Sequence, residues 1–296
     1  MKPLFGKVGV FGVGLLGGSV ALGIKERFLA EEVHAYDQDP MALEKALFLG
    51  VADRVHTEVG PWVGELDLGI LAAPVGALAE LGKALAPWAH PDSLWTDVGS
   101  VKAKVVAALE GLLPHYLGGH PMAGSERAGV ENAHAGLLQN AVWVLTPTER
   151  TSPRAREGVR GLVEALGAYP LEMPPGRHDE LVARVSHLPY LLAVALNRMV
   201  AQSPHRDLLM FLAAGGFRDL TRVASGSPRM SRDMVVENKE ALKEAIEELR
   251  EVLLELEGLL DERTDRIGQG GNRLGSGRRH LGASSQQAGG RSRASS

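Results

Sequence analysis

The sequence predicts an α/β fold with a doubly wound parallel sheet, followed by an all-α part, and three observations support this prediction. Short apolar segments alternate with helix-compatible segments through the first 145 residues, which is the pattern of repeated strand–helix–strand units. A glycine-rich turn directly follows the first apolar segment. After the Pro174-Pro175 pair, apolar residues repeat at helical spacing.

The expected strands are short apolar runs at 7–11, 33–36, 66–71, 93–96 and 141–145. The helices expected between them cover 19–29, 40–49, 75–85 and 101–112. Pro40 stands in the first turn of one helix and Gly50 follows its end, which are favoured positions for these residues. Because strand–helix–strand crossovers are right-handed, this order predicts a parallel sheet with helices on both faces.

Two apolar stripes run through the helical part. The first consists of Leu181, Val185, Leu188, Leu192, Ala195 and Met199. Pro189 lies inside it and predicts a kink beside His187. The second consists of Leu242, Ile246, Leu249, Leu253, Leu256 and Leu260, widened by Ala245, Val252 and Leu259. That width indicates burial against another helix, either within a monomeric core or across a homodimer.

Composition limits the class of protein. The 296 residues are 45% hydrophobic and 23% charged, and the absence of cysteine excludes disulfides, thiolate catalysis and cysteine-bound metals. Lys7 interrupts the first apolar run, and no run of about 18 apolar residues occurs, so we expect neither a signal peptide nor a membrane span. These features predict a cytoplasmic enzyme without a membrane partner.

The turn after the first strand has the pattern Gly12-x-Gly14-x-x-Gly17 and opens a helix. Gly12 permits a tight turn, Gly14 lets the backbone approach a pyrophosphate, and Gly17 lets the helix pack closely on the strand. The backbone at Leu15 and Leu16 begins the helix, whose amides would face the anion. In this context the motif predicts a Rossmann-type dinucleotide site.

Asp37 ends the second strand 20 residues after Gly17. Its carboxylate would accept hydrogen bonds from ribose hydroxyls and repel a 2′-phosphate, so the predicted cofactor is NAD rather than NADP. An acid here can also simply form the turn before Pro40. Ala73 and Pro74 end the third strand, where small residues leave room for a nucleotide, although a tight turn would look the same.

His120 lies in residues 118–126, GGHPMAGSE, which we expect to form a loop. An imidazole there can hold and deprotonate a substrate hydroxyl while a nicotinamide takes the hydride, and we therefore predict that His120 is catalytic. Ser125 and Glu126 either reach the substrate or lie on a surface loop.

Ser100 follows the fourth strand and has two compatible interpretations. It would hold a substrate hydroxyl beside the nicotinamide, or cap the helix 101–112. Lys102 and Lys104 are expected to be solvated on that helix. His178 and His187 are nine residues apart, which is not the spacing of a metal-binding pair, so no metal site is predicted.

Arg222 ends a charged run that begins after Gly215-Gly216. Its planar guanidinium matches a carboxylate in a bidentate fashion, which suits an anionic small-molecule substrate. Charged runs are also typical of a solvated surface.

We expect three parts: a dinucleotide-binding domain over 1–173, a helical substrate and dimerisation domain over 174–264, and a disordered Gly/Ser/Arg-rich tail over 265–296. The tail has six arginines and one aspartate, in a chain of net charge −4. A basic tail can tether a protein to nucleic acid or a membrane, but so polar a segment is more typical of a solvated extension. We predict no nucleic-acid partner.

Five segments together resemble the prephenate dehydrogenase family. They are G-x-G-L-x-G-G-S at 12–19, D-x-G-S-V-K at 97–102, G-G-H-P-x-A-G-S-E at 118–126, S-H-L-P at 186–189 and G-F-R-D-x-T-R at 216–222. The resemblance covers about residues 6–262 and depends on all five motifs occurring in this order.

The resemblance implies NAD-dependent oxidative decarboxylation of prephenate to 4-hydroxyphenylpyruvate in tyrosine biosynthesis. It implies that His120 acts on the ring C4 hydroxyl with help from Ser100, and that Arg222 binds a substrate carboxylate. Ser125, Glu126 and His187 would line the pocket. The chain departs from many relatives at Tyr190, where they carry histidine, and at Ser231, where they carry tryptophan, which leaves arogenate as an alternative substrate.

Two other interpretations remain. Another two-domain dehydrogenase of the β-hydroxyacid type would be expected to carry a catalytic lysine on the first helix of its second domain, and no lysine lies between Lys104 and Lys239. A non-enzymatic NAD sensor or tail-dependent binding protein would not need His120.

Overall fold

The computed structural model describes residues 2–125, 127–225 and 228–261, and within them eight strands form one sheet. The strand order is β3-β2-β1-β4-β5-β6-β7-β8. The strands are β1 (Phe5–Phe11), β2 (Ala30–Tyr36), β3 (Arg54–His56), β4 (Leu68–Leu71), β5 (Leu94–Asp97), β6 (Tyr116–Pro121), β7 (Val142–Thr146) and β8 (Tyr169–Glu172). Every neighbouring pair is parallel except β6 and β7.

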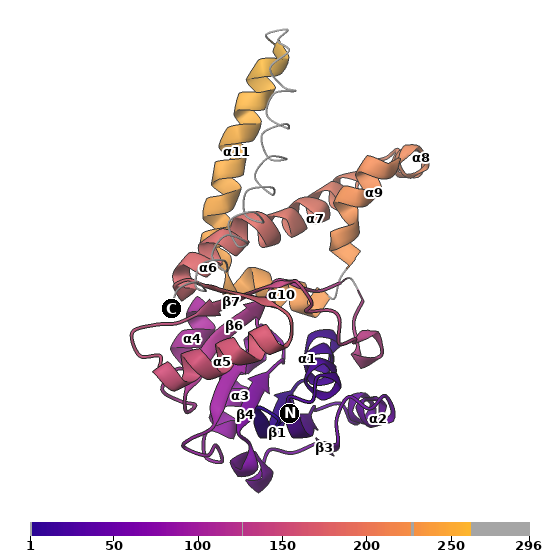
Figure 1. Ribbon diagram of the computed structural model, residues 1–296. Helices are drawn as coiled ribbons and strands as arrows, with labels where there is room; N and C mark the ends of the chain where they lie inside the picture. Colours follow the sequence, from indigo (N-terminus) through magenta and orange to yellow (C-terminus); the bar gives the residue numbers. More distant parts are fainter. Residues whose placement is uncertain (1, 126, 226–227, 262–296) are drawn as a thin grey trace, which may run out of the picture. The chain divides into compact units, whose positions relative to one another are not determined.

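Helices cover both faces of this sheet (Figure 1). They are α1 (Leu15–Glu26), α2 (Pro40–Phe48), α3 (Leu78–Leu85), α4 (Ala103–Leu109) and α5 (Pro153–Ala165), with short 3₁₀ helices η1 (Pro61–Glu65), η2 (Val75–Ala77) and η3 (Val130–Asn132). One buried core joins α1, α2 and α5 to one face of the central strands, and a second joins α3 and α4 to the other. Because side chains alternate along a strand, Val10 enters the first core and Phe11 the second. The predicted doubly wound α/β fold is therefore confirmed.

Several elements differ from the prediction. Strands β3, β6 and β8 and helix α5 were not predicted, and the antiparallel β6–β7 pair interrupts the expected parallel sheet. The helix expected over 101–112 spans only Ala103–Leu109. Strand β6 escaped prediction because its Gly-Gly-His-Pro sequence has low strand propensity, whereas pairing with β5 and β7 on both sides supplies the backbone partners.

The remaining described residues are helical. They form α6 (Pro175–Val182), η4 (Ala183–His187), α7 (Leu188–Ala201), α8 (Arg206–Leu212), α9 (Gly215–Arg222), η5 (Val223–Ser225), α10 (Pro228–Glu237) and α11 (Lys239–Asp261). The segment η4 is a π-helical turn, located where Pro189 predicted an irregularity beside His187. The chain divides into two units at residue 243, within α11.

The predicted apolar stripe of α7 is only partly covered. Of its predicted members, Leu181 and Leu188 are half-buried, whereas Val185, Leu192, Ala195 and Met199 are exposed. The buried residues of α7 are Ala193 and Val200, which lie outside the predicted stripe. Helix α8 exposes Leu208, Met210, Phe211 and Leu212. No helix in the described residues is both long and apolar enough to cross a membrane.

Candidate active site at the carboxyl edge of the sheet

The glycine-rich turn connects β1 to α1 at the carboxyl edge of the sheet. Gly12 has φ +109°, and a Cβ atom there would lie 2.7 Å from the carbonyl oxygen of Ala72. A Cβ atom on Gly17 would lie 1.9 Å from the carbonyl oxygen of Gly12, so the helix approaches the turn too closely for any side chain. Beside Gly14, by contrast, a Cβ atom would meet nothing within 4 Å. The turn is thus packed on its inner side and open at Gly14, where α1 begins.

The predicted cofactor residues gather around this turn. The carboxylate of Asp37 accepts hydrogen bonds from the backbone N–H of Val13 (2.9 Å) and of Asp39 (3.0 Å), so it supports both the glycine turn and the turn before α2. A cavity of about 320 Å³ adjoins it, lined by residues that include Gly14, Asp37, Lys45 and Glu131. Ala73 and Pro74 come shortly after β4, and the backbone nitrogen of Ala73 lies beside Gly12. A second cavity, about 470 Å³, lies at the opposite edge of the sheet, near Phe5.

His120 is the penultimate residue of β6 and is only 9% exposed, so its expected place in a loop was wrong. Its Nδ1 atom lies 2.8 Å from Nε2 of His178, the two rings meeting edge to face. Burial lowers the pKa of His120 well below its usual value, and His178, Lys102 and His187 lower it further. The imidazole is therefore neutral at physiological pH.

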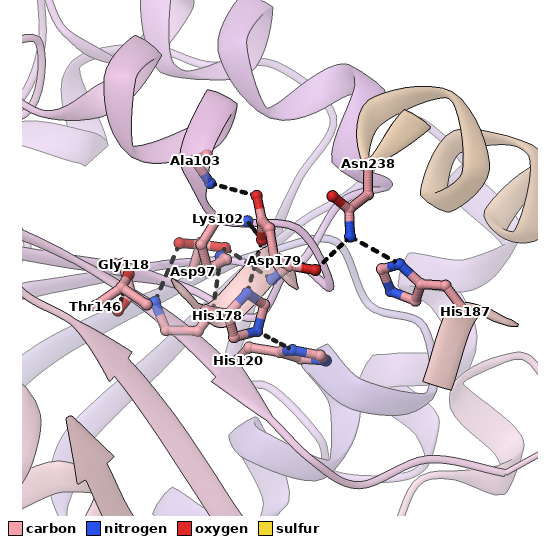
Figure 2. Close-up of polar contacts among 12 residues, drawn as sticks. Asp97, Lys102, Ala103, Gly118, His120, Thr146, His178, Asp179, His187 and Asn238 are labelled. Carbon is pink, nitrogen blue, oxygen red and sulfur yellow. Dashed lines mark hydrogen bonds and ion pairs between the residues drawn. The ribbon is translucent and has the colours of Figure 1, made fainter. Parts of the chain in front are cut away.

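His178 and Asp179 lie on α6, the first helix of the helical part of the chain, and they complete a relay to His120. Nδ1 of His178 lies 2.7 Å from Oδ1 of Asp179 (Figure 2). The same carboxylate accepts hydrogen bonds from the backbone N–H of Lys102 (2.7 Å) and Ala103 (2.8 Å). Asp179 therefore caps the start of α4, and the expectation that Ser100 would cap this helix was wrong.

The relay determines which nitrogen of each ring carries a proton. An ionised Asp179 can only accept a hydrogen bond, so Nδ1 of His178 carries the proton and Nε2 of His178 has a free lone pair. That lone pair must accept from His120, which places the proton of neutral His120 on Nδ1. Nε2 of His120 is then a lone-pair acceptor, which is the state that a general base needs.

Lys102 is fully buried, and the expectation that it would be solvated was wrong. Its Nζ atom contacts Oδ1 of Asp97 and donates to the carbonyl oxygen of Gly119 at 2.8 Å. Lys104, as expected, is solvent-exposed, and it pairs with Glu237 at 3.1 Å. The two lysines differ because Lys102 precedes the first turn of α4 and points under β6, whereas Lys104 lies on the helix itself.

His187 lies on the π-helical turn and is fully buried. The amide of Asn238 donates to the backbone oxygen of Asp179 at 2.9 Å and lies 3.1 Å from Nδ1 of His187 (Figure 2). Because Nδ1 accepts this bond, neutral His187 carries its proton on Nε2. That atom is buried and has no hydrogen-bond partner among the described residues. Burial lowers the pKa of His187 to about 4.

The other predicted substrate residues are less closely tied to His120. Ser100 is half-buried in the turn after β5. Ser125 is exposed, and its hydroxyl accepts from the backbone N–H of Arg127 at 3.1 Å. Arg222 is exposed at the end of α9, a helix that packs against α7. Glu126 lies outside the described residues.

The prediction missed His178, Asp179 and Asn238. The adjacent His-Asp pair after Pro174-Pro175 was a usable signal, because a carboxylate beside an imidazole is a common way to orient a base. Nothing in the linear sequence connects that pair to His120, which lies 58 residues earlier.

A doubly wound sheet with a glycine-rich turn after β1, and a neutral imidazole at the same edge, defines a Rossmann-type dehydrogenase. Two family descriptions match the chain: "Prephenate dehydrogenase, nucleotide-binding domain" over residues 20–170, and "Prephenate dehydrogenase, dimerization domain" over residues 174–268. The chain belongs to the prephenate dehydrogenase family.

Three relatives illustrate the similarity. Prephenate dehydrogenase of Bacillus subtilis is 38% identical over 239 residues, which are 78% of this chain and 64% of that protein. The structure of Aquifex aeolicus prephenate dehydrogenase with hydroxyphenyl propionate and NAD+ matches with a TM-score of 0.82 and 32% identity, covering 96% of this chain and 98% of that one. Synechocystis arogenate dehydrogenase matches with a TM-score of 0.78 and 29% identity, covering 93% and 99%. The chain thus spans somewhat under two thirds of the Bacillus relative.

Proposed function

We propose that this chain is an NAD-dependent dehydrogenase that converts prephenate to 4-hydroxyphenylpyruvate by oxidative decarboxylation. The observation that carries the proposal is the relay from Asp179 through His178 to His120, which leaves Nε2 of His120 as a base at the cofactor edge of the sheet. A neutral imidazole is suited to remove the proton of a secondary alcohol as its hydride leaves.

The chemistry assigned to His120 balances. Nε2 of His120 accepts the proton of the C4 hydroxyl as the hydride leaves C4. NAD, when bound, supplies the acceptor for that hydride. The bond between the ring and its carboxylate then breaks, carbon dioxide leaves, and the electron pair makes the ring aromatic. His120 returns its proton to the resulting phenolate oxygen, so the base is regenerated.

The residues around the glycine turn fit NAD. Gly14 and the first amides of α1, at Leu15, Leu16 and Gly17, would bind the pyrophosphate, because the turn is open at Gly14 and helix N-terminal amides attract anions. Asp37 borders the adjoining cavity, where its carboxylate would bind the ribose hydroxyls and disfavour NADP. Ala73 and Pro74 would leave room for the rest of the dinucleotide.

The substrate is a dianion, and the proposal assigns it several donors. The Nε2–H of His187 is a buried donor without a partner among the described residues, and a substrate oxygen would satisfy it. Ser100 would donate to or accept from the C4 hydroxyl beside His120. Arg222 would pair with a carboxylate, and Ser125 and Glu126 would complete the pocket.

Arogenate is the second candidate substrate. It differs from prephenate in the side chain, which carries an amino group in place of the keto group. Tyr190 occupies a position that we expect to lie at the side-chain end of the pocket, and a similar solved structure is that of an arogenate dehydrogenase. The same base chemistry at His120 would apply to either substrate.

We also propose that the chain works as a homodimer and that its parts divide as predicted, at 173/174 and 264/265. The two family matches, the first ending at residue 170 and the second beginning at residue 174, support the first boundary. The dimerization description, together with the exposed apolar residues of α7 and α8, supports the dimer. The tail and its predicted disorder lie outside the described residues. A cytoplasmic location, without membrane or nucleic-acid partners, stays a prediction.

The first experiment is an absorbance assay at 340 nm with the purified chain. NAD or NADP is combined with prephenate or arogenate at matched concentrations. The proposal expects NADH formation with NAD and prephenate. Reduction of NAD with arogenate alone would identify arogenate as the substrate and keep the proposed chemistry. Equal use of NADP would show that Asp37 does not select NAD. No reduction with either substrate, in protein that binds NAD, would refute the proposed function.

A further inference from the structure

A buried ion pair lies beneath the strand that carries His120. Lys102 and Asp97 are both 0% exposed, and the ammonium contacts Oδ1 of the carboxylate. The same carboxylate accepts hydrogen bonds from the hydroxyl of Tyr116 at 2.6 Å and from the backbone N–H of Gly99 at 2.7 Å. The ammonium also donates to the carbonyl oxygen of Gly119. The pair therefore joins the end of β5 to two points along β6.

Such a pair is costly to bury. Removing two charges from water costs several kcal/mol per ion after relaxation, and a well-packed apolar pair in the same space is often at least as stable. The backbone of Gly119 is tightly packed beside the pair. A Cβ atom on Gly119 would lie 2.6 Å from Nε1 of Trp143 and 2.8 Å from the backbone oxygen of Asp97. Stability alone therefore does not account for a buried charged pair that contacts Gly119, the residue directly before the proposed base His120.

We propose that the Asp97–Lys102 pair is a positioning element for His120. It holds the carbonyl of Gly119, the residue that precedes the imidazole, and it places the ammonium of Lys102 beneath the strand that carries the base. The inference rests on the proposed function, in which His120 is the base, and adds Asp97 and Lys102 to the residues on which that reaction depends.

The electrostatics agree with this role. The positive charge of Lys102 lowers the pKa of His120, in addition to the larger effect of burial. Burial also lowers the pKa of Lys102, whereas Asp97 opposes that shift and favours the charged ammonium. Among the described residues, His178, Lys102 and His187 act on the imidazole directly. Asp179 contacts His178, while Asp97 contacts Lys102 and Tyr116.

The test compares four variants of the full chain. Lys102→Met and Asp97→Asn each leave one uncompensated buried charge, which is expected to destabilise the fold. The double variant Asp97→Asn with Lys102→Met removes both charges and keeps the approximate shape, so it is the variant expected to fold. Lys104→Met is the matched control, because it removes the exposed lysine two residues further along. Circular dichroism and thermal unfolding establish which variants are folded.

The first readout needs no reaction. Histidine-ring NMR follows the titration of His120 in the ligand-free protein, with its signal assigned from the His120→Asn variant. Removing the charge of Lys102 should raise the titration midpoint of His120 in Lys102→Met, and by a smaller amount in the double variant, which also loses the opposing charge of Asp97. Asp97→Asn, which keeps the positive charge, should not raise it, and Lys104→Met should leave it unchanged. A merely structural pair would not give this pattern.

The second readout is the pH profile of kcat/KM with NAD and prephenate. The acid limb should move to higher pH in the double variant, and each pH unit by which it moves should lower the activity on that limb by about tenfold. An unchanged midpoint and an unchanged acid limb in the folded double variant would overturn the inference. Inactive wild-type protein would instead refute the proposed function, and the ligand-free titration would still report on the pair.

Discussion

Nδ1 of His120 and Nε2 of His178 lie 2.8 Å apart, although β6 and α6 supply them from positions 58 residues apart in the chain. Because Asp179 holds the far side of His178, the contact sets both the orientation and the tautomer of His120. The Asp179 carboxylate is in turn held by two amides at the start of α4. The proposed base is therefore positioned by the junction between the sheet and the helical part of the chain.

Replacing His120 tests the base directly. His120→Asn should lower turnover by about 10² or more, because proton transfer from the substrate hydroxyl is lost. NAD binding, measured by calorimetry, should stay unchanged because the glycine turn is untouched. Near wild-type turnover would show that His120 is not the base.

His178 should affect turnover more than substrate binding. We expect His178→Phe to lower kcat by roughly 10- to 100-fold with little change in KM, because an unheld imidazole spends less time in the productive tautomer. His90→Asn, at an exposed histidine before β5, is the matched control and should behave as wild type. Equal losses in kcat and kcat/KM are compatible with this role, whereas a change confined to KM would contradict it.

Arg222 tests the proposed carboxylate contact. Arg222→Ala should raise the KM for prephenate by an amount that corresponds to about 2–4 kcal/mol of binding free energy, because it removes a charge partner that the bound substrate would desolvate. Arg218→Ala, on the same helix, should change KM little. Steady-state kinetics at saturating NAD measures both, and equal KM values for the two variants would remove Arg222 from the substrate site.

The exposed side chain of Phe211 tests the dimer. Phe211 on α8 is 85% exposed in the single chain, and Phe48 on α2 is 88% exposed. If α8 lies in a dimer interface, Phe211→Glu should shift the protein toward monomer in sedimentation experiments, because a charge would be buried there. Phe48→Glu should leave the dimer intact. Dimers of equal affinity in both variants would place the interface elsewhere.

His187 should make the fold sensitive to acid. Its pKa is lowered to about 4 in the folded protein, whereas an unfolded histidine titrates near 6.5. The unfolded state therefore takes up a proton first as the pH falls below 6.5, and stability present above that pH is lost as it approaches 4. From pH 7 to 4.5 this loss should be on the order of 2–3 kcal/mol.

Urea unfolding at the two pH values measures that loss. His187→Asn should lose less stability over the interval than the wild type, because the buried titrating group is gone. His205→Asn, at an exposed histidine before α8, should lose as much as the wild type. The same acid sensitivity in His187→Asn would show that other groups account for it.

Local patterns predicted most of the sheet. The alternation of apolar segments and helices predicted β1, β2, β4, β5 and β7, because each is a short apolar run bounded by turn residues. The pattern failed at β6, whose glycines leave room for Trp143 and Thr146 rather than supplying apolar side chains. The prediction that Lys102 is solvated also failed, because its partners Asp97 and Gly119 come together only when β5 and β6 pair.

The sequence by itself therefore determined the fold class and the glycine turn with Asp37, and it singled out His120 as the candidate base, since each depends on residues close together in the chain. Only the tertiary structure decided how that imidazole is held. His178 and Asp179 reach it from α6, and Lys102 lies beneath its strand. These contacts depend on burial and on pairing between distant segments, which set hydrogen-bond partners and pKa values and leave no periodic trace in the sequence.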